Sequence, residues 1–236
     1  MLEAQADIEM PLSPWSRSPL KRIVDIAVVC AASPLLCPLF LIIAAAVRLS
    51  SPGPAIFRQT RIGACAKPFT ILKFRTMLVP DADEQHGIAS AAAERITPIG
   101  EILRKLKLDE LPQFFNVLRG DMSLVGPRPR IAEQQLGIFL CKPGITGAAT
   151  LAFAREESFL SQIPPESLPQ YYREHVLPAK HSLDSAYMAQ ATLSSDLRLL
   201  LLTALGRWHA PRLHAQHVRE SRPPTDAEPI CGSEPA

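Results

Sequence analysis

The sequence lacks the marks of a disulfide-bonded, zinc-binding or nucleic-acid-binding protein. Its five cysteines are an odd number without a C-x-x-C pair, which argues against a disulfide framework and a zinc site. The formal net charge of +2 does not indicate nucleic acid as a partner, because such partners require a concentrated basic face. The 236 residues suffice for one substantial core, so we expect one catalytic domain with appendages.

Formal charge is missing from residues 26–47, and these 22 residues are enough to span a hydrocarbon core of about 30 Å as one straight helix. Pro34 and Pro38 interrupt the run, and each removes a backbone donor. We therefore expect a kink or break at Ser33 and Pro34, where the Ser33 hydroxyl can bond back to a freed carbonyl.

Basic residues flank this apolar run on both sides. They are Arg17, Lys21 and Arg22 before it, and Arg48, Arg58 and Arg61 after it. Because cytoplasmic flanks carry positive charge, a segment that enters and leaves by the same face satisfies both ends. We expect residues 20–49 to form a re-entrant membrane helix. A signal anchor that crosses once is the alternative, whereas a cleaved signal peptide would need a small-residue cleavage site that the sequence lacks.

Acidic residues are absent between Arg48 and Pro80. The basic residues of this stretch are Arg48, Arg58, Arg61, Lys67, Lys73 and Arg75. Such a stretch suits anionic headgroups or a phosphate-rich substrate, with a solvated basic face as the alternative. Residues 55–57 and 68–74 have strand character and are separated by a turn at Gly63. Strand alternation would place Lys73 and Arg75 on one face.

Helical patterns dominate the remainder of the chain. Apolar residues recur with helical spacing at Ile99, Ile102, Leu103 and Leu106. This basic amphipathic helix lies either in a membrane interface or against the core. Further helices are expected over 112–118, ending at Gly120, and over 197–205. The predicted fold class is α+β, mostly helical: a small catalytic domain with a re-entrant N-terminal helix and interfacial amphipathic helices.

Two adjacent acids, Asp109 and Glu110, precede Pro112, a residue favoured in the first turn of a helix. Backbone N–H groups at a helix start favour ionised carboxylates and collect anions. One carboxylate can then attack a phosphorus while the other holds a divalent cation. Ordinary helix capping is the alternative explanation for the pair.

A proline-rich turn follows at residues 126–129. Pro127 and Pro129 hold Arg128 in a fixed direction, and a guanidinium is suited to bidentate phosphate contact. A purely structural proline turn is the alternative. Further on, the Gly-rich turn at 142–147 can bring backbone close to a ligand.

Together these motifs resemble the bacterial sugar transferase family, the monotopic phosphoglycosyl transferases that start polysaccharide or glycoconjugate assembly. The resemblance runs from about Lys21 to Arg207 with the motifs in one order. They are Lys21-Arg22 with Asp25, Ser33-Pro34, Gly53-Pro54 with Gln59, Arg61 and Gly63, Lys73 to Met77, Arg95 to Thr97, Leu108 to Gln113, Asn116-Val117, Gly120 to Pro129, and Pro143 to Gly147.

The resemblance implies that Asp109 is the nucleophile and that Glu110 ligates Mg²⁺. The substrates would be a nucleotide diphosphosugar, a UDP-sugar, and polyprenyl (undecaprenyl) phosphate. Transfer of the sugar 1-phosphate would pass through an aspartyl intermediate and release the nucleoside monophosphate. This is the first membrane step of exopolysaccharide, capsule, O-antigen or glycoprotein glycan synthesis. Phosphate or substrate binding is assigned to Lys73, Arg75, Arg95, Arg104 and Arg128.

The resemblance also implies a location in the bacterial inner membrane, with the catalytic domain on the cytoplasmic face of the lipid bilayer. We expect a flexible lead over residues 1–19, the re-entrant helix over 20–49, the catalytic domain over 50–207 and a disordered tail over 208–236. The oligomeric state stays open, a homo-oligomer included.

The sequence departs from the family pattern in two places. Ala93-Glu94 replaces an acid-Pro pair, and residues 148–151 replace an aromatic and a Gln, which leaves the sugar and nucleotide specificity open. Two other functions are alternatives to the transferase. One is a non-catalytic membrane scaffold that retains the fold, and the other is a metal-dependent phosphohydrolase that uses water as the acceptor.

Overall fold

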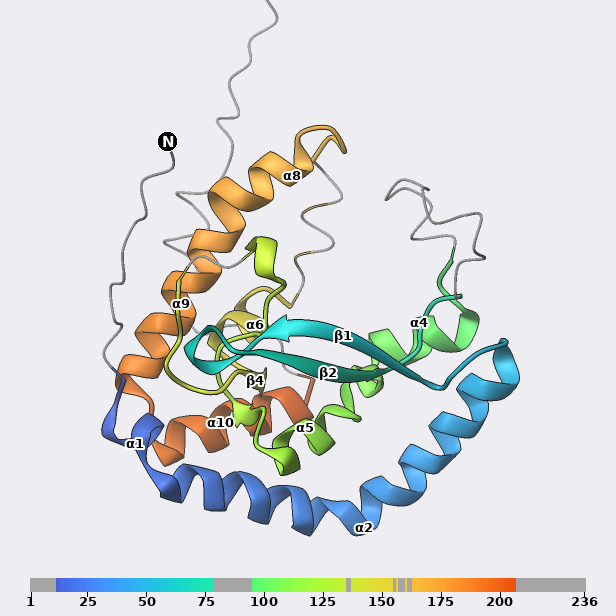
Figure 1. Ribbon diagram of the computed structural model, residues 1–236, viewed down its shortest axis with the longest axis horizontal. Helices are drawn as coiled ribbons and strands as arrows, with labels where there is room; N and C mark the ends of the chain where they lie inside the picture. The colour runs from blue at the N-terminus through green and yellow to red at the C-terminus, as the bar shows by residue number, and fades with distance from the viewer. Residues whose placement is uncertain are drawn as a thin grey trace, which may run out of the picture.

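The computed structural model describes residues 12–78, 95–134, 137–154, 156, 160 and 163–206, and shows a mostly helical α+β arrangement (Figure 1). The predicted class is confirmed at this level. The elements are α1 (Pro14–Arg17), α2 (Pro19–Ser50), β1 (Ile56–Ile62), η1 (Ala64–Ala66), β2 (Pro68–Phe74), α4 (Pro98–Lys105), η3 (Leu108–Glu110), α5 (Gln113–Arg119), β3 (Ser123–Val125), η4 (Ala132–Gln134), β4 (Gly144–Thr146), α6 (Ala148–Ala152), α8 (Leu168–Tyr171), η5 (Tyr172–Val176), α9 (Leu177–Gln190) and α10 (Leu193–Ala204).

Two small sheets organise the strands. β1 and β2 form an antiparallel hairpin in which Ile56 faces Phe74 and Ile62 faces Pro68. β3 and β4 pair in parallel. The predicted second strand, 68–74, is confirmed, whereas the first is longer than the predicted 55–57. Its continuation is rich in polar residues on both faces, so hydrophobicity alone did not reveal it.

The apolar core has two parts, and α2 contributes to both. The first part contains Val29, Ile71, Val117, Met122, Leu124, Val125, Leu151 and Leu199. The second contains Ile43, Val47, Phe74 and Leu103. Burial of apolar side chains at both ends of α2 therefore fixes the two halves of this long helix to the rest of the protein.

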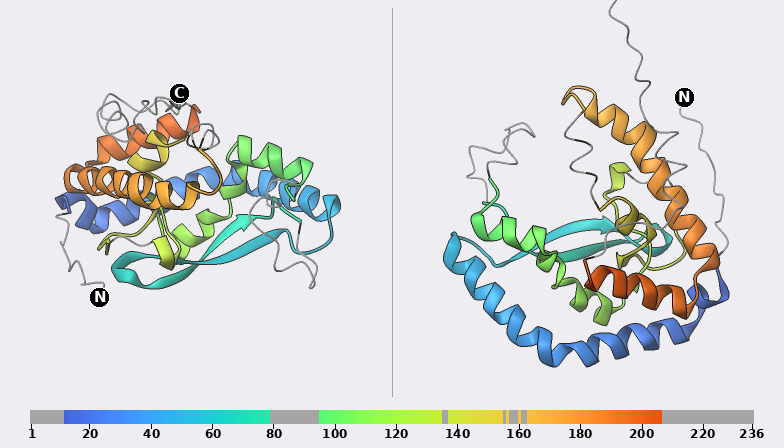
Figure 2. Two further views of the ribbon diagram at one scale, coloured as in Figure 1. Left: turned by 90° about the horizontal axis from the view of Figure 1, so that it is seen from above. Right: turned by 180° about the vertical axis from the view of Figure 1, so that it is seen from behind.

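The helix α2 is continuous across Pro34 and Pro38. Pro34 cannot donate to the carbonyl of Cys30, and the Ser33 hydroxyl donates to that oxygen at 2.8 Å, as predicted. Figures 1 and 2 show that α2 is bent and that both of its ends lie on the side of the remaining elements. The prediction of a kink agrees with this path. By length and composition alone, the helix is also apolar enough to cross a membrane.

Part of the predicted flexible lead has a defined structure. Residues 12–18 belong to the predicted flexible lead, yet they include α1, and the amide of Ser13 donates to the Met188 carbonyl at 2.9 Å. Trp15 explains this order, because its indole N–H donates to Asp196 Oδ2 at 2.8 Å. Lys21 forms an ion pair with the same carboxylate. Side-chain hydrogen bonds thus hold a segment whose composition favoured disorder. Residues 1–11 lie outside the described residues.

The predicted helices are present as α4, α5 and α10. In α4, Leu103 is buried whereas Ile102 and Leu106 are exposed, so one part of the apolar face packs on the core and another part does not. Gly120 ends α5 with a left-handed φ of 94°, as its position predicted. The predicted tail over 208–236 lies outside the described residues.

Candidate active site

The two candidate catalytic acids lie in the short 3₁₀ helix η3, between α4 and α5. Lys107 precedes η3 in a left-handed conformation, with φ of 57°, and this turns the chain sharply after α4. The N-cap of α5 is Pro112, which has no capping side chain. The capping explanation for Asp109 and Glu110 therefore does not hold, because neither carboxylate caps α5.

Glu110 lies at the centre of an ion-pair cluster. Its Oε1 accepts a hydrogen bond from Lys73 Nζ at 2.9 Å and lies 3.5 Å from Arg128 Nη2. These partners come from the end of β2 and from the loop that follows β3, so one carboxylate joins three chain segments. Burial acts to raise the pKa of Glu110, but the charges of Arg128 and Lys73 outweigh it and lower the pKa.

Asp109 differs from its neighbour in both partners and pKa. The residue is 8% exposed, and its Oδ1 has no hydrogen-bond partner. Burial raises the pKa of this carboxyl, and the charge of Glu110 raises it further. A buried, unpartnered carboxylate oxygen is costly in a folded protein, and such groups are frequent at functional sites. The adjacent acids therefore have different chemical environments, with Glu110 paired with two cations and Asp109 Oδ1 left without a hydrogen-bond partner.

The loop over 126–130 is held in place by backbone contacts. The amide of Gly126 donates to the Thr146 carbonyl at 3.0 Å, and a Cβ on Gly144 would lie 2.1 Å from the Gly126 nitrogen. The Gly-rich turn was predicted to approach a ligand. Instead, Gly144 allows close approach to the neighbouring loop. Asp184 adds a second attachment, because its carboxylate accepts from the amides of Arg128 and Ala149 at 3.3 and 3.1 Å.

A cleft of about 890 Å³ opens beside the two acids, a volume within the usual range for small-molecule sites. We call it the basic cleft. Among the described residues, its basic side chains are Arg61, Lys73, Arg75, Arg95, Arg104, Lys105, Lys107 and Arg128, and its acidic ones are Glu101, Asp109 and Glu110. This excess of positive charge suits a ligand with several phosphate charges.

Four of the five predicted phosphate ligands fit this cleft. Lys73 and Arg128 pair with Glu110, Arg104 Nε donates to the Thr76 hydroxyl at 3.0 Å, and Arg95 donates to the Leu78 carbonyl at 3.0 Å. All four line the cleft. Pro127 and Pro129 flank Arg128 in the loop, as the motif predicted.

Arg75, the fifth predicted phosphate ligand, has hydrogen-bond partners outside the cleft. Its guanidinium donates to the carbonyls of Ser51 at 2.7 Å, Val47 at 3.3 Å and Pro52. These carbonyls lie at and just beyond the C-terminal end of α2, where the helix leaves acceptors without partners. Although Arg75 also borders the cleft, its terminal nitrogens donate hydrogen bonds to these carbonyls. The sequence could not reveal this, because the acceptors are backbone atoms more than 20 positions away.

Three basic residues of the cleft were not assigned to the site, namely Arg61, Lys105 and Lys107. Along β1, Phe57, Gln59 and Arg61 line the cleft at every second position, and Arg58 lies on the other face. The period of a longer β1 would have identified Arg61. Nothing local distinguished Lys107 from its basic neighbours.

The described residues contain no group of three or more His, Cys, Asp or Glu side chains placed to hold a metal ion. A Mg²⁺ ion nevertheless fits the acids in the way it often binds in phosphate-transfer sites, through one or two carboxylates and the substrate phosphates. Glu110 Oε1 is already paired with Lys73, so a metal would use its other oxygen.

Sequence comparison identifies the family of the chain. A family model described as bacterial sugar transferase matches residues 16–209, most of the chain. The chain belongs to the bacterial sugar transferase family. The match covers α2, both sheets, η3 and the loop that carries Arg128, so the site belongs to the part that defines the family.

Curated relatives of this family member carry related names. A UDP-glucose:undecaprenyl-phosphate glucose-1-phosphate transferase of Caulobacter vibrioides is 45% identical over 140 residues, 55% of this chain and 52% of the relative. The Escherichia coli protein of that name is 44% identical over 160 residues, 64% and 34% of the two chains. A UDP-N-acetylgalactosamine-undecaprenyl-phosphate N-acetylgalactosaminephosphotransferase of Aeromonas hydrophila is 50% identical over 142 residues, 55% and 33%. The aligned part is thus about a third to a half of each relative's length.

Proposed function

We propose that this protein transfers a sugar 1-phosphate from a UDP-sugar to undecaprenyl phosphate, with Asp109 as the nucleophile. The observation that carries the proposal is the buried, unpartnered Asp109 Oδ1 beside a cleft lined by basic side chains. The names of the relatives support both substrates, because the three relatives are named for transfer from a UDP-sugar to undecaprenyl phosphate.

In the first step, Asp109 Oδ1 forms a bond to the sugar-linked phosphorus. The bond from that phosphorus to the bridging oxygen breaks, and the electron pair leaves with uridine monophosphate. Arg128 and Lys73 lie beside Glu110 and face the same cleft, so their charges can stabilise the phosphate oxygens during transfer. The raised pKa of Asp109 makes it a stronger nucleophile once ionised than a solvated carboxylate.

In the second step, an oxygen of polyprenyl phosphate attacks the same phosphorus, and the bond to Asp109 breaks. The product carries a diphosphate, and the carboxylate is restored. An apolar groove of about 380 Å³ supports a lipid acceptor, because Leu111, two residues from Asp109, forms part of its wall. Phe114, Phe115 and residues of α2 complete the groove, and we assign it to the polyprenyl chain.

Mg²⁺ is the proposed cofactor, held by the free oxygen of Glu110 and by substrate phosphates. When bound, it would neutralise phosphate charge during attack. Lys73 and Arg128 fix the orientation of the Glu110 carboxylate and keep it ionised, since they lower its pKa.

For the membrane we propose that α2 is re-entrant and that the catalytic domain lies on the cytoplasmic face of the inner membrane. The two ends of α2 lie on the same side of its bend, and Leu35, Leu41 and Ile42 near the bend are exposed (Figure 1). The exposed Ile102 and Leu106 of α4 would contact the interface. The alternative of a helix that crosses once predicts opposite locations for the two ends.

The test is release of uridine monophosphate from a panel of UDP-sugars by membrane fractions, with Mg²⁺ and undecaprenyl phosphate present. The native chain, Asp109→Asn and the control Glu174→Gln, an exposed acid outside the cleft, are compared. We expect release by the native chain and the control, and none by Asp109→Asn. Without lipid, the native chain should retain the sugar phosphate covalently, whereas Asp109→Asn should not.

Two outcomes would decide for the alternatives. Steady release without any lipid acceptor would indicate a phosphohydrolase. Absence of release from every donor, in a folded protein that still binds membranes, would indicate a scaffold. Unchanged release by Asp109→Asn would remove this residue from the mechanism.

A further inference from the structure

A smaller cavity lies behind Arg128, and we call it the side cavity. It is about 170 Å³ in volume and is lined by Arg130, Gln134, Thr150, Tyr172 and others. The side cavity joins the basic cleft, because Arg61, Lys107 and Arg128 line both. A ligand with its phosphates in the cleft can therefore extend into it.

Arg130 is the unusual residue of this cavity. Its side chain is buried, at 7% exposure, and neither Nη1 nor Nη2 has a hydrogen-bond partner. Asp184 is the nearby carboxylate, but it accepts from the amides of Arg128 and Ala149 instead. A buried guanidinium whose two terminal nitrogens lack hydrogen bonds is costly, so it indicates a missing partner.

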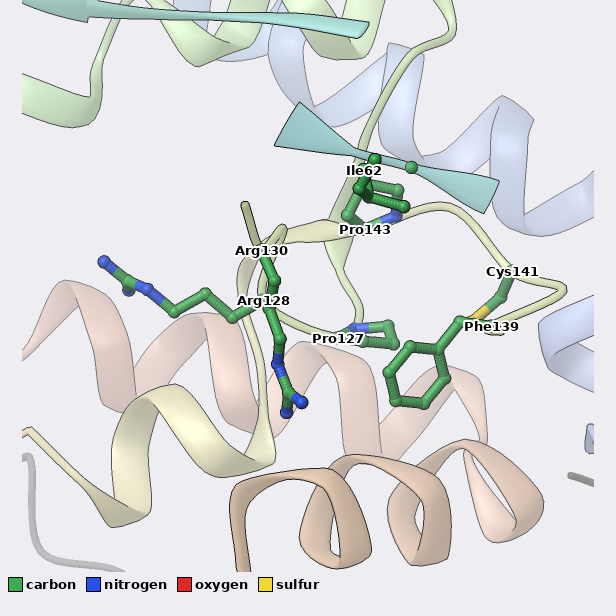
Figure 3. Close-up of a pocket in the computed structure, with 8 residues that line it drawn as sticks. Ile62, Pro127, Arg128, Arg130, Phe139, Cys141 and Pro143 are labelled. Carbon is green, nitrogen blue, oxygen red and sulfur yellow. The ribbon is translucent and has the colours of Figure 1, made fainter. Parts of the chain in front are cut away.

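A backbone hydrogen bond fixes the position of Arg130 in the loop. The Arg130 carbonyl accepts from the Ile62 amide at 2.8 Å, which attaches the residue to the end of β1. Figure 3 shows that the guanidinium groups of Arg128 and Arg130 point in different directions from the same loop. The loop thus directs one cation to Glu110 and a second cation elsewhere.

The size and lining of the side cavity favour a sugar ring. A water molecule occupies about 30 Å³ in the liquid, so the cavity has room for about six waters, comparable with one hexose. The small side chains of Ala149 and Thr150 leave this space open, and the Gln134, Thr150 and Tyr172 side chains provide hydrogen-bonding groups. The basic cleft is several times larger and holds most of the basic residues, which suits the nucleotide part of the donor.

We propose that the side cavity binds the sugar of the donor and that Arg130 donates hydrogen bonds to a hydroxyl or acetamido oxygen of that sugar. Arg130 is thereby a specificity residue, distinct from Arg128, which faces the phosphates. The inference rests on the proposed transferase function and names the subsite that selects among donors.

The test compares Arg130→Gln and Arg130→Lys with Arg58→Gln, an exposed arginine on the opposite face of β1. Uridine monophosphate release is measured with UDP-glucose, UDP-galactose and their N-acetylamino counterparts. Loss of a charge-assisted hydrogen bond should raise KM for the preferred donor about 10- to 100-fold and change the ranking of donors. Arg130→Lys should retain part of the preference, and Arg58→Gln should match the native chain.

Inhibition by UDP, which has no sugar, separates the alternatives. We expect the inhibition constant of UDP to stay within about twofold in Arg130→Gln, because UDP has no sugar for Arg130 to bind. Loss of even a single hydrogen bond would change the constant by more than this. If UDP inhibition weakened as much as donor binding, the proposal would be overturned, and Arg130 would belong to a nucleoside subsite. Thermal unfolding gives a further check, since the terminal nitrogens of Arg130 have no hydrogen bond to lose and Arg130→Gln should not lower Tm.

An unchanged donor ranking and KM in Arg130→Gln would also overturn the proposal, as would a lower Tm with all donors affected equally. These outcomes differ from failure of the proposed function itself, in which the native chain would release uridine monophosphate from no donor.

Discussion

Replacement of Arg75 by Met tests whether this arginine stabilises α2 or binds phosphate. Arg75 is 4% exposed, and its guanidinium donates to three carbonyls at or just beyond the end of α2. A hydrogen bond to a charged group contributes about 1.5–3 kcal/mol, and a cation at a helix C-terminus adds about 0.3–1 kcal/mol. Because bonds from one group are not additive, we expect Arg75→Met to lose about 3–5 kcal/mol of stability.

The matched variant is Lys73→Met, two residues earlier in the chain. Lys73 pairs with Glu110 and is partly exposed, so the pair contributes about 1 kcal/mol or less to stability. Its loss should mainly raise KM for the donor, because a cleft cation is removed while Glu110 loses a hydrogen bond.

The assays are thermal unfolding in detergent and donor kinetics. For a chain of 150–250 residues, 1 kcal/mol shifts Tm by about 2–4 °C, so Arg75→Met should unfold about 10 °C lower with KM within about threefold. Lys73→Met should show the reverse, with Tm within about 3 °C and KM at least about tenfold higher. The reasoning is refuted if Arg75→Met keeps its Tm and raises KM as much as Lys73→Met.

Three further results are expected. Asp109→Asn should lose transfer by about 10⁴-fold or more and yet unfold at the same or a higher temperature at pH 7. The pKa of the native Asp109 carboxyl is raised in the folded state, so the folded protein binds this proton more tightly than the unfolded chain. The contribution of Asp109 to stability therefore falls as pH rises through the folded pKa. A lower Tm in Asp109→Asn would contradict this sign. As pH is lowered, the transfer rate should begin to fall at a pH above the ordinary aspartate pKa. In Lys73→Met this fall should occur at a still higher pH, because Lys73 lowers the pKa of Asp109. The pH–rate profiles of the two proteins check both expectations. Asp196→Ala should destabilise the protein by about 3–5 kcal/mol, since it leaves Lys21 buried without its partner. Chemical denaturation measures this loss, and a much smaller value would show that the ion pair is unimportant.

Local patterns in the sequence were sufficient for several features. Gly120 predicted the end of α5 because a left-handed residue ends a helix, and Ser33 before Pro34 predicted the bond to the Cys30 carbonyl because proline frees an acceptor one turn back. The motif order identified the family, and with it the pair Asp109 and Glu110. The predictions at Gly120 and Ser33, and each motif by itself, depend on residues that lie within a few positions of one another.

Tertiary structure decided what long-range contacts control. Lys73 and Arg75 share a strand pattern, yet one pairs with Glu110 and the other with the end of α2, because different segments pack beside each. The unpartnered oxygen of Asp109 and the unpartnered guanidinium of Arg130 depend on which groups surround them in space. The sequence by itself determined the family, the helices α2, α4, α5 and α10, and the charged residue types. Only the packing of distant segments decided which charges are paired, which are buried and which face the cleft, since electrostatic environment depends on distance in space and on exclusion of water.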